Sequence, residues 1–223
     1  MRMWLDGRRI SSKCAGTRVR RAMRPGKDLP IKRFASGAAW QAWLAKQHDT
    51  SSGVWVEFAK KGSGLRSLSR PEALEIALCY GWIDGQAVSV DTQRWRQRFT
   101  PRRARSKWSQ INCAAVERLH AAGRLASAGI REMEAAKGDG RWERAYGSPR
   151  TMPVPEDLQA ALVAHPQARR AFAQLDGQNR YAILYRLHDA KRPETRARRL
   201  AGFIRMLEAG ETLHKRKSRR AAV

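Results

Sequence analysis

The stretch Arg94–Trp108 contains seven basic residues, several aromatic residues and no acidic residue. Guanidinium groups form bidentate hydrogen bonds with phosphate or carboxylate groups, and they also stack on aromatic rings. The pattern therefore predicts a site for an anionic ligand or for a nucleic-acid backbone. The alternative is a solvated strand face with its aromatic residues in the core. The lack of a nearby carboxylate argues against a purely structural role in salt bridges.

We expect the ligand to lie in a groove between Gly81–Gln86 and this basic stretch. Within Arg94–Phe99, the period of a strand places every second residue on the same face, so arginines occupy one face and aromatic residues the other. A helix predicted from Ser106 would add an N-terminal dipole that favours anions. The side chains predicted to line the site are Trp82, Asp84, Arg94, Arg96, Arg98, Arg102, Arg103, Arg105, Lys107 and Trp108.

Asp84 lies between two glycines in Gly81-Trp82-Ile83-Asp84-Gly85 and is the weak candidate for a catalytic residue. It is either a general base, a residue that orients an arginine, or a turn aspartate that caps a helix end or pairs with an arginine. A single acid without a partner nucleophile does not form a catalytic set, so an enzyme is the less favoured reading. Lys60-Lys61-Gly62-Ser63-Gly64 lacks the Walker pattern. The five histidines show no metal-binding spacing, and we expect neither a metal nor a cofactor.

The elements that must position these residues fall into two halves. Ser36 and Ser69 are predicted N-caps of helices, and Pro71 and Glu72 support the second start. Further helices are predicted over 106–122, 127–137, 156–164, 166–175, from about 177 to 187, and from Pro193. Strands are predicted over 54–59, 87–90 and 93–99. The order predicts an α+β fold, with a small antiparallel sheet and helices in the N-terminal half and an all-α module after it.

The formal net charge of +25 is concentrated at the two ends of the chain. Residues 1–33 hold 11 basic and 2 acidic residues, and residues 215–223 hold five basic residues and no acid. We interpret 1–33 as a basic, disordered extension and 215–223 as a basic, disordered tail. Between them we predict an α+β domain over 34–150 and a helical module over 151–214. These 181 residues keep a net charge of +11, so the body is basic without its ends.

The three cysteines, Cys14, Cys79 and Cys113, are widely spaced and form no CxxC motif. This pattern indicates a reducing compartment in which the thiols behave as small apolar residues. No apolar signal segment and no run of about 18 apolar residues is present. The expectation is a cytoplasmic protein without a transmembrane segment.

Several blocks of the chain are similar to a known bacterial family. They are the runs 53–64, 72–86, 98–112, 179–187 and 191–196, which include Gly-Trp-Ile-Asp-Gly and Arg-Phe-Thr-Pro-Arg-Arg. Together they resemble the YdeI/OmpD-associated, or bacteriocin-protection, family over about 34–214. The resemblance implies a role in tolerance of bacteriocins and cationic antimicrobial peptides and in envelope stress, with a small helical module near 155–210. It supplies no catalytic residue and no cofactor.

The leading hypothesis is a non-enzymatic stress or antimicrobial-peptide-resistance protein that binds an anionic ligand or an acidic protein partner through the basic stretch. One alternative is a nucleic-acid-binding protein that uses the same stretch and the basic ends. The other is an enzyme on a small anionic substrate with Asp84 as its base. A protein with a net charge of +25 does not attract cationic peptides, so protection is expected to act through regulation or an envelope partner.

Overall fold

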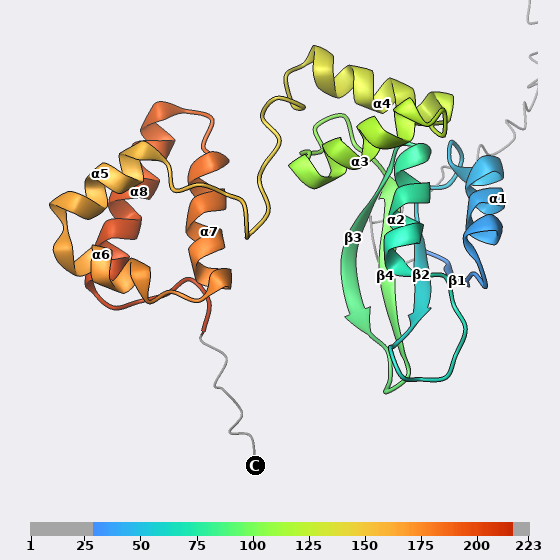
Figure 1. The fold of residues 1–223 in the computed structure, drawn as a ribbon, viewed down its shortest axis with the longest axis horizontal. Helices are drawn as coiled ribbons and strands as arrows, with labels where there is room; N and C mark the ends of the chain where they lie inside the picture. Colours follow the sequence, from blue (N-terminus) through green and yellow to red (C-terminus); the bar gives the residue numbers. More distant parts are fainter. Residues whose placement is uncertain (1–28, 216–223) are drawn as a thin grey trace, which may run out of the picture.

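The computed structural model describes residues 29–215, which form an α+β part followed by a group of four helices (Figure 1). Most of the predicted basic extension, including Cys14, and all but one residue of the predicted tail lie outside the described residues. The α+β part contains β1 (Ile31–Arg33), α1 (Gly37–Gln47), β2 (Val54–Ala59), α2 (Arg70–Cys79), β3 (Trp82–Ser89), β4 (Arg94–Pro101), α3 (Gln110–Ala121) and α4 (Ser127–Gly138). The helical module contains α5 (Glu156–Ala164), α6 (Pro166–Ala173), α7 (Gly177–His188) and α8 (Pro193–Glu208).

The four strands form one sheet in the order β1-β2-β4-β3. The pairs β2–β4 and β4–β3 are antiparallel, whereas β1 is parallel to β2. The α+β class is thus confirmed, but the sheet is mixed rather than purely antiparallel. Because β1 pairs Ile31 with Trp55 and Arg33 with Glu57, the folded domain begins before the expected boundary at Phe34. β1 has only three residues, which is too few for the alternation of apolar and polar residues in a strand to be recognised in the sequence.

Serine side chains begin three of the helices. The hydroxyls of Ser36, Ser69 and Ser109 accept hydrogen bonds from the backbone N–H three residues later and so satisfy a free donor of the first turn. Since Ser109 is the cap of α3, this helix begins at Gln110. The expected helix start at Ser106 is wrong, because Ser106 instead closes a turn by accepting a hydrogen bond from the N–H of Arg103 at 3.0 Å.

The strand β3 begins at Trp82, earlier than the predicted start at residue 87. Gly81 makes this early start possible, because its φ of +71° ends α2 and redirects the chain within one residue. A Cβ at this position would also lie 3.0 Å from the carbonyl oxygen of Ala128 in α4. The turn after α2 is thus confined to Tyr80 and Gly81, and Trp82–Gly85 already belong to the sheet.

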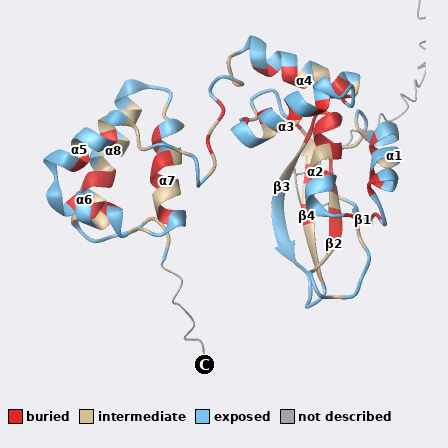
Figure 2. Ribbon diagram, in the orientation of Figure 1, coloured by how far each residue is buried: buried red, intermediate tan, exposed pale blue. Residues whose placement is uncertain are grey.

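Three apolar clusters hold the molecule together, as the buried segments in Figure 2 show. The first joins α1 and α2 to one face of the sheet around the fully buried Trp40 and Trp82. The indole N–H of Trp40 donates to the carbonyl of Ala73 at 3.0 Å and so ties α1 to α2. The second cluster packs α3 and α4 against α2, and the third forms the interior of the helical module. The two parts thus have separate cores, and polar and aromatic contacts connect them.

A basic cleft between the α+β part and the helical module

The predicted groove between Gly81–Gln86 and the basic stretch does not form, because β3 and β4 are neighbouring hydrogen-bonded strands. Trp82 is fully buried, and its indole N–H donates to the carbonyl of His48 at 3.0 Å. Asp84 accepts a hydrogen bond from the guanidinium of Arg70, the first residue of α2, at 2.7 Å. Asp84 therefore faces α2, and its arginine partner comes from outside the predicted basic stretch.

The arginines of β4 lie on the opposite face of the sheet. Arg94, Arg96 and Arg98 alternate with Trp95, Gln97 and Phe99, and of these only Phe99 and Gln97 are buried. The predicted division of the strand into a basic face and an aromatic face is what the structure shows. The basic face of β4 points away from α1 and α2, so it is not part of a site with Asp84.

Arg102 turns inward, where it stacks on Trp108. The guanidinium carbon lies 3.4 Å from the centre of the Trp108 ring, and only 6% of Arg102 is exposed. Its Nη1 donates to the carbonyl of Lys107 at 3.2 Å, and no carboxylate of the described residues forms an ion pair with it. Burial lowers the pKa of Arg102 to about 10, which still leaves it charged at neutral pH. Arg102 thus contacts residues of its own loop, 102–108, and Arg103 is exposed in the turn that this loop makes.

The remaining predicted residues, Arg105, Lys107 and Trp108, line a cleft between the two parts of the chain. Its volume is about 300 Å³, within the range of small-molecule sites. The loop 104–108, the segment 139–146 and the C-terminal end of α7 with the residues after it surround this space. The lining residues are Ala104, Arg105, Lys107, Trp108, Asp139, Arg141, Arg144, Tyr146, Tyr185, His188, Asp189 and Lys191.

The charges of the cleft do not balance. Five lining residues are arginines or lysines and two are aspartates. Both aspartates are already paired: Asp139 with Arg141 at 2.6 Å and Asp189 with Lys107 at 2.5 Å. The hydrogen bonds from Arg141 hold the pKa of Asp139 below its ordinary value, so it stays ionised. Three cationic side chains are left without a carboxylate partner within the described part of the chain.

Two of the unpaired cations are well placed to meet a ligand. Arg105 and Lys191 are exposed, and neither forms a hydrogen bond or an ion pair through its side chain within residues 29–215. Arg105 comes from the loop after β4, whereas Lys191 follows α7, so they approach the cleft from different parts. The third, Arg144, is partly held because it donates to the backbone carbonyl of Asp139 at 2.9 Å.

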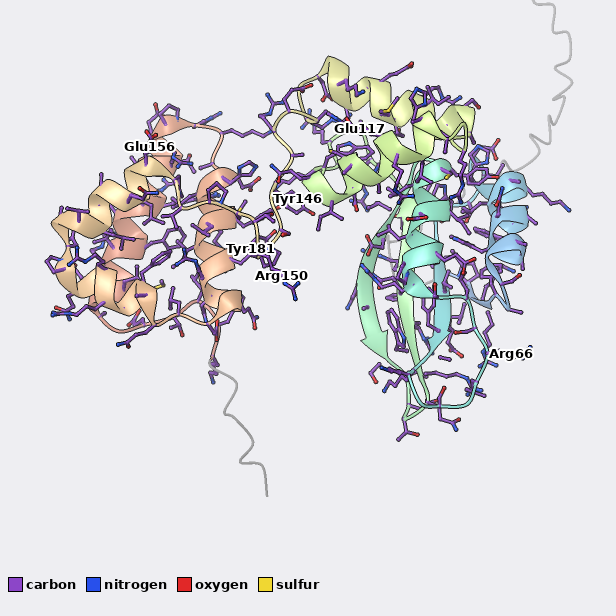
Figure 3. All side chains as sticks on the ribbon, in the orientation of Figure 1. Arg66, Glu117, Tyr146, Arg150, Glu156 and Tyr181 are labelled. Atoms are coloured by element: carbon purple, nitrogen blue, oxygen red, sulfur yellow. The ribbon has the colours of Figure 1, made fainter. Side chains whose placement is uncertain are left out.

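Aromatic side chains form the apolar part of the cleft wall. Tyr146 and Tyr185 meet edge to face with ring centres 5.1 Å apart. Figure 3 shows Tyr146 on the segment between the two parts, with Tyr181 facing it from α7. Burial, together with the nearby Tyr185, raises the pKa of Tyr146, so its phenol is neutral at physiological pH.

Lys107 connects the two parts directly. Its ammonium donates to the hydroxyl of Tyr185 at 3.3 Å and pairs with Asp189. Partial burial lowers the pKa of Lys107, but the contacts with Asp189 and Tyr185 outweigh this effect and raise the pKa above its ordinary value. The ammonium is therefore charged under physiological conditions. Lys107 lines one side of the cleft, and its contacts there join the loop 104–108 to α7 and the residue after it.

Of the residues that line the cleft, only Arg105, Lys107 and Trp108 were predicted from the sequence; those that were missed include Arg141, Arg144, Tyr146, Tyr185 and Lys191. The sequence placed Tyr185 in a helix predicted from about 177 to 187 and assigned no role to the segment 139–146. Their signal was a second basic and aromatic run, Arg141-Trp142-Glu143-Arg144-Ala145-Tyr146, but nothing in the sequence indicates which helix lies against it.

Within residues 29–215, no group of three or more His, Cys, Asp and Glu side chains is placed to hold a metal ion. The thiols of Cys79 and Cys113 are buried, and burial raises the pKa of Cys113 to about 11, so it is a neutral thiol. No helix in this range has the length and apolar character needed to cross a membrane.

Fold and cleft together define a two-part protein in which a helical module closes a basic, aromatic-lined cleft on an α+β domain. Residues 151–210 match the model of the family described as Bacteriocin-protection, YdeI or OmpD-Associated, which confirms the resemblance for the helical module. Residues 32–132 match a different model, described as a Domain of unknown function (DUF8412). The similar blocks within 53–112 therefore lie in this second match. No curated protein and no solved structure matches the chain.

Proposed function

We propose that this protein serves in stress or antimicrobial-peptide resistance by binding a small anion in the cleft between its two parts. The family description of the helical module supports the biological role. The observation that carries the binding role is the charge of the cleft, where five cationic side chains meet two carboxylates that are both already paired. An anion would supply the missing negative charge.

The wall of the cleft favours an anion with a flat apolar part. Trp108, Tyr146 and Tyr185 offer ring surfaces, while Arg105 and Lys191 offer charges that have no side-chain partner among residues 29–215. A space of about 300 Å³ fits a molecule with one ring and one phosphate or carboxylate group. Such a ligand would touch both parts at once and so stabilise their contact, which gives binding a way to change the protein's surface.

The test is calorimetric titration of the full chain with phenyl phosphate. Inorganic phosphate lacks the ring and benzyl alcohol lacks the charge, so each is expected to bind more weakly. In the double variant Arg105→Gln/Lys191→Gln, phenyl phosphate should bind at least about tenfold more weakly, because two charge-assisted contacts are lost. Both residues are exposed and form no ion pair within the described part of the chain, so the fold should persist.

The matched control is Arg169→Gln/Arg170→Gln, which removes the same charge from an exposed surface of α6. It should bind like the wild type. Equal binding by the cleft variant and the control would contradict the proposal, as would tighter binding of benzyl alcohol than of phenyl phosphate. In cells exposed to a bacteriocin, the cleft variant should lose protection that the control retains.

A further inference from the structure

A second basic surface lies on the sheet, on the side away from α1 and α2. We call it the arginine face and define it by Arg33, Trp55, Glu57, Arg94, Arg96 and Arg98. The register places these residues on one side of β1, β2 and β4, since Arg33 and Arg96 both pair with Glu57 and Arg98 pairs with Trp55. None of them belongs to the three apolar clusters. The cleft uses none of them either.

Glu57 sits at the centre of the arginine face and organises it. Its carboxylate is buried and lies 2.6 Å from Nε of Arg33, 3.6 Å from Nε of Arg94 and 3.8 Å from Nη2 of Arg96. One carboxylate thus accepts a hydrogen bond from Arg33 and lies within ion-pair distance of Arg94 and Arg96. With Arg98 included, four positive charges face one negative charge, which leaves the surface strongly positive.

Arg98 has no carboxylate partner within the described residues. It lies against Gly85 at the irregularity of β3, where a Cβ would come within 3.1 Å of its Nε. The Nε atoms of Arg96 and Arg98 are buried and have no hydrogen-bond acceptor in this part of the chain, so an external anion would meet the terminal nitrogens of these guanidinium groups. Four guanidinium groups around one carboxylate repel one another, and a bound anion would reduce this repulsion. The arginine face therefore calls for an anionic partner.

The spacing of the arginines suits a linear polyanion. Alternate residues of a strand lie about 6.7 Å apart, which is comparable to the separation of successive phosphates along an extended nucleic-acid strand. Trp55 is half-buried on the same face beside Arg98 and presents a ring on which a base can stack. Val88 of β3, opposite Arg96, is 41% exposed and extends the apolar contact area.

We infer that the arginine face binds single-stranded nucleic acid, with its phosphates on Arg94, Arg96 and Arg98 and a base on Trp55. An open sheet face with arginines and an aromatic ring suits unpaired bases, whereas the duplex major groove admits a helix or a two-stranded ribbon. The basic segment 1–28, with nine basic and two acidic residues, has the wrong charge to occupy this face. The inference is independent of the proposed ligand of the cleft.

Fluorescence anisotropy of the full chain with a labelled 20-nucleotide single strand tests the inference over a series of salt concentrations. In Arg94→Gln/Arg96→Gln/Arg98→Gln, the slope of log K against log salt should fall by about 2, because each phosphate contact on a single strand contributes about 0.7. The matched control, Arg169→Gln/Arg170→Gln/Arg198→Gln, removes the same charge from exposed positions of the helical module. The effect of net charge alone on the slope is measured by the binding of each variant to another polyanion, heparin. After this effect is subtracted, the control should keep the wild-type slope.

Two milder variants guard against misfolding of the triple variant, since Arg94 and Arg96 also contact Glu57. Arg98→Gln leaves every ion pair intact and should reduce the slope by about 0.7. Trp55→Leu should weaken binding roughly tenfold without changing the slope, because stacking is insensitive to salt. Tryptophan emission and circular dichroism verify that each variant is folded.

The inference is overturned if the triple variant and its control bind the strand with equal affinity and slope, because the basic ends would then carry the binding. It is also overturned if a duplex of the same sequence binds as tightly as the single strand. Binding of anionic lipid vesicles that is lost in the triple variant, without binding of the single strand, would assign the face to a membrane surface instead.

Discussion

Replacing Arg102 with methionine tests whether the structure places this charge correctly. Arg102 is 6% exposed, stacks on Trp108 and has one hydrogen bond, to the carbonyl of Lys107. Removing one partner of a buried ion pair costs about 3–5 kcal/mol because the other charge stays buried and uncompensated, whereas removing a buried charge that has no ion-pair partner leaves no such charge behind and relieves its desolvation cost. The structure predicts the second behaviour.

The expected magnitude follows from three contributions. The fall in the pKa of Arg102 from 12.5 to about 10 corresponds to about 3 kcal/mol against the buried charge. The stacking on Trp108 offsets about 0.5–2 kcal/mol, and the hydrogen bond to Lys107 offsets about 1.5–3 kcal/mol. A methionine thioether packs favourably on the same ring. We therefore expect Arg102→Met to change the free energy of unfolding by no more than about 1 kcal/mol.

Urea unfolding followed by tryptophan emission measures this change in the α+β part, which contains Arg102. All eight tryptophans precede residue 143, so their emission does not report on the helical module. Arg102→Lys is the control, because it keeps the buried charge but loses the planar stack, and it should lose about 2 kcal/mol. A loss above about 3 kcal/mol in Arg102→Met, with Arg102→Lys near the wild type, would refute the structure's account of an unpaired arginine.

The remaining predictions concern the pH dependence of the helical module, a glycine and a thiol. The bonds from Arg196 lower the folded pKa of Asp157, so the stability from this pair is present above pH 3.8 and is lost as the pH falls through the lowered pKa. In circular dichroism melts at pH 6, wild type should therefore be more stable than Arg196→Gln by at most about 1 kcal/mol, because the pair is partly exposed. This difference should shrink as the pH falls below 3.8. Gly81→Ala should cost about 2 kcal/mol more in urea unfolding than Gly62→Ala, since both have positive φ but only the first meets other atoms. Peptide mapping after thiol alkylation at pH 8 should find Cys113 unmodified in the native protein, because its pKa is raised to about 11.

Local signals in the sequence predict most of the helices. The cap at Ser36, the cap at Ser69 with Pro71, and the prolines Pro166 and Pro193 mark four helix starts, and the structure places helices at all four. These signals work because a cap satisfies the free N–H groups of the first turn within a few residues of chain. The helix start at Ser106 was wrong because two serines compete there, and only the contact of Tyr146 with residues 108 and 110 decides between them.

Pairing between distant segments could not be predicted in the same way. The strand β1 has three residues, and its partner lies more than 20 positions away. The cleft depends on where α7 docks, and contacts of Lys107 with Tyr185 and Asp189, of Tyr185 with Tyr146 and of His188 with the carbonyl of Arg144 join it to the α+β part. The sequence contains the residues of both sides but no period or motif that relates them. Composition predicts that a basic site exists, whereas its location depends on tertiary contacts.

The basic stretch Arg94–Trp108 consequently serves two surfaces rather than one. Up to Pro101 it is a strand, whose alternation sends arginines to the face opposite the core. After Pro101 the strand period ends, Arg102 turns onto Trp108, and the loop carries Arg105 and Lys107 toward the helical module. The inward Arg102 separates the two surfaces, because it fixes the loop between them. An unpaired buried arginine at this junction is therefore consistent with a positioning role for both sites.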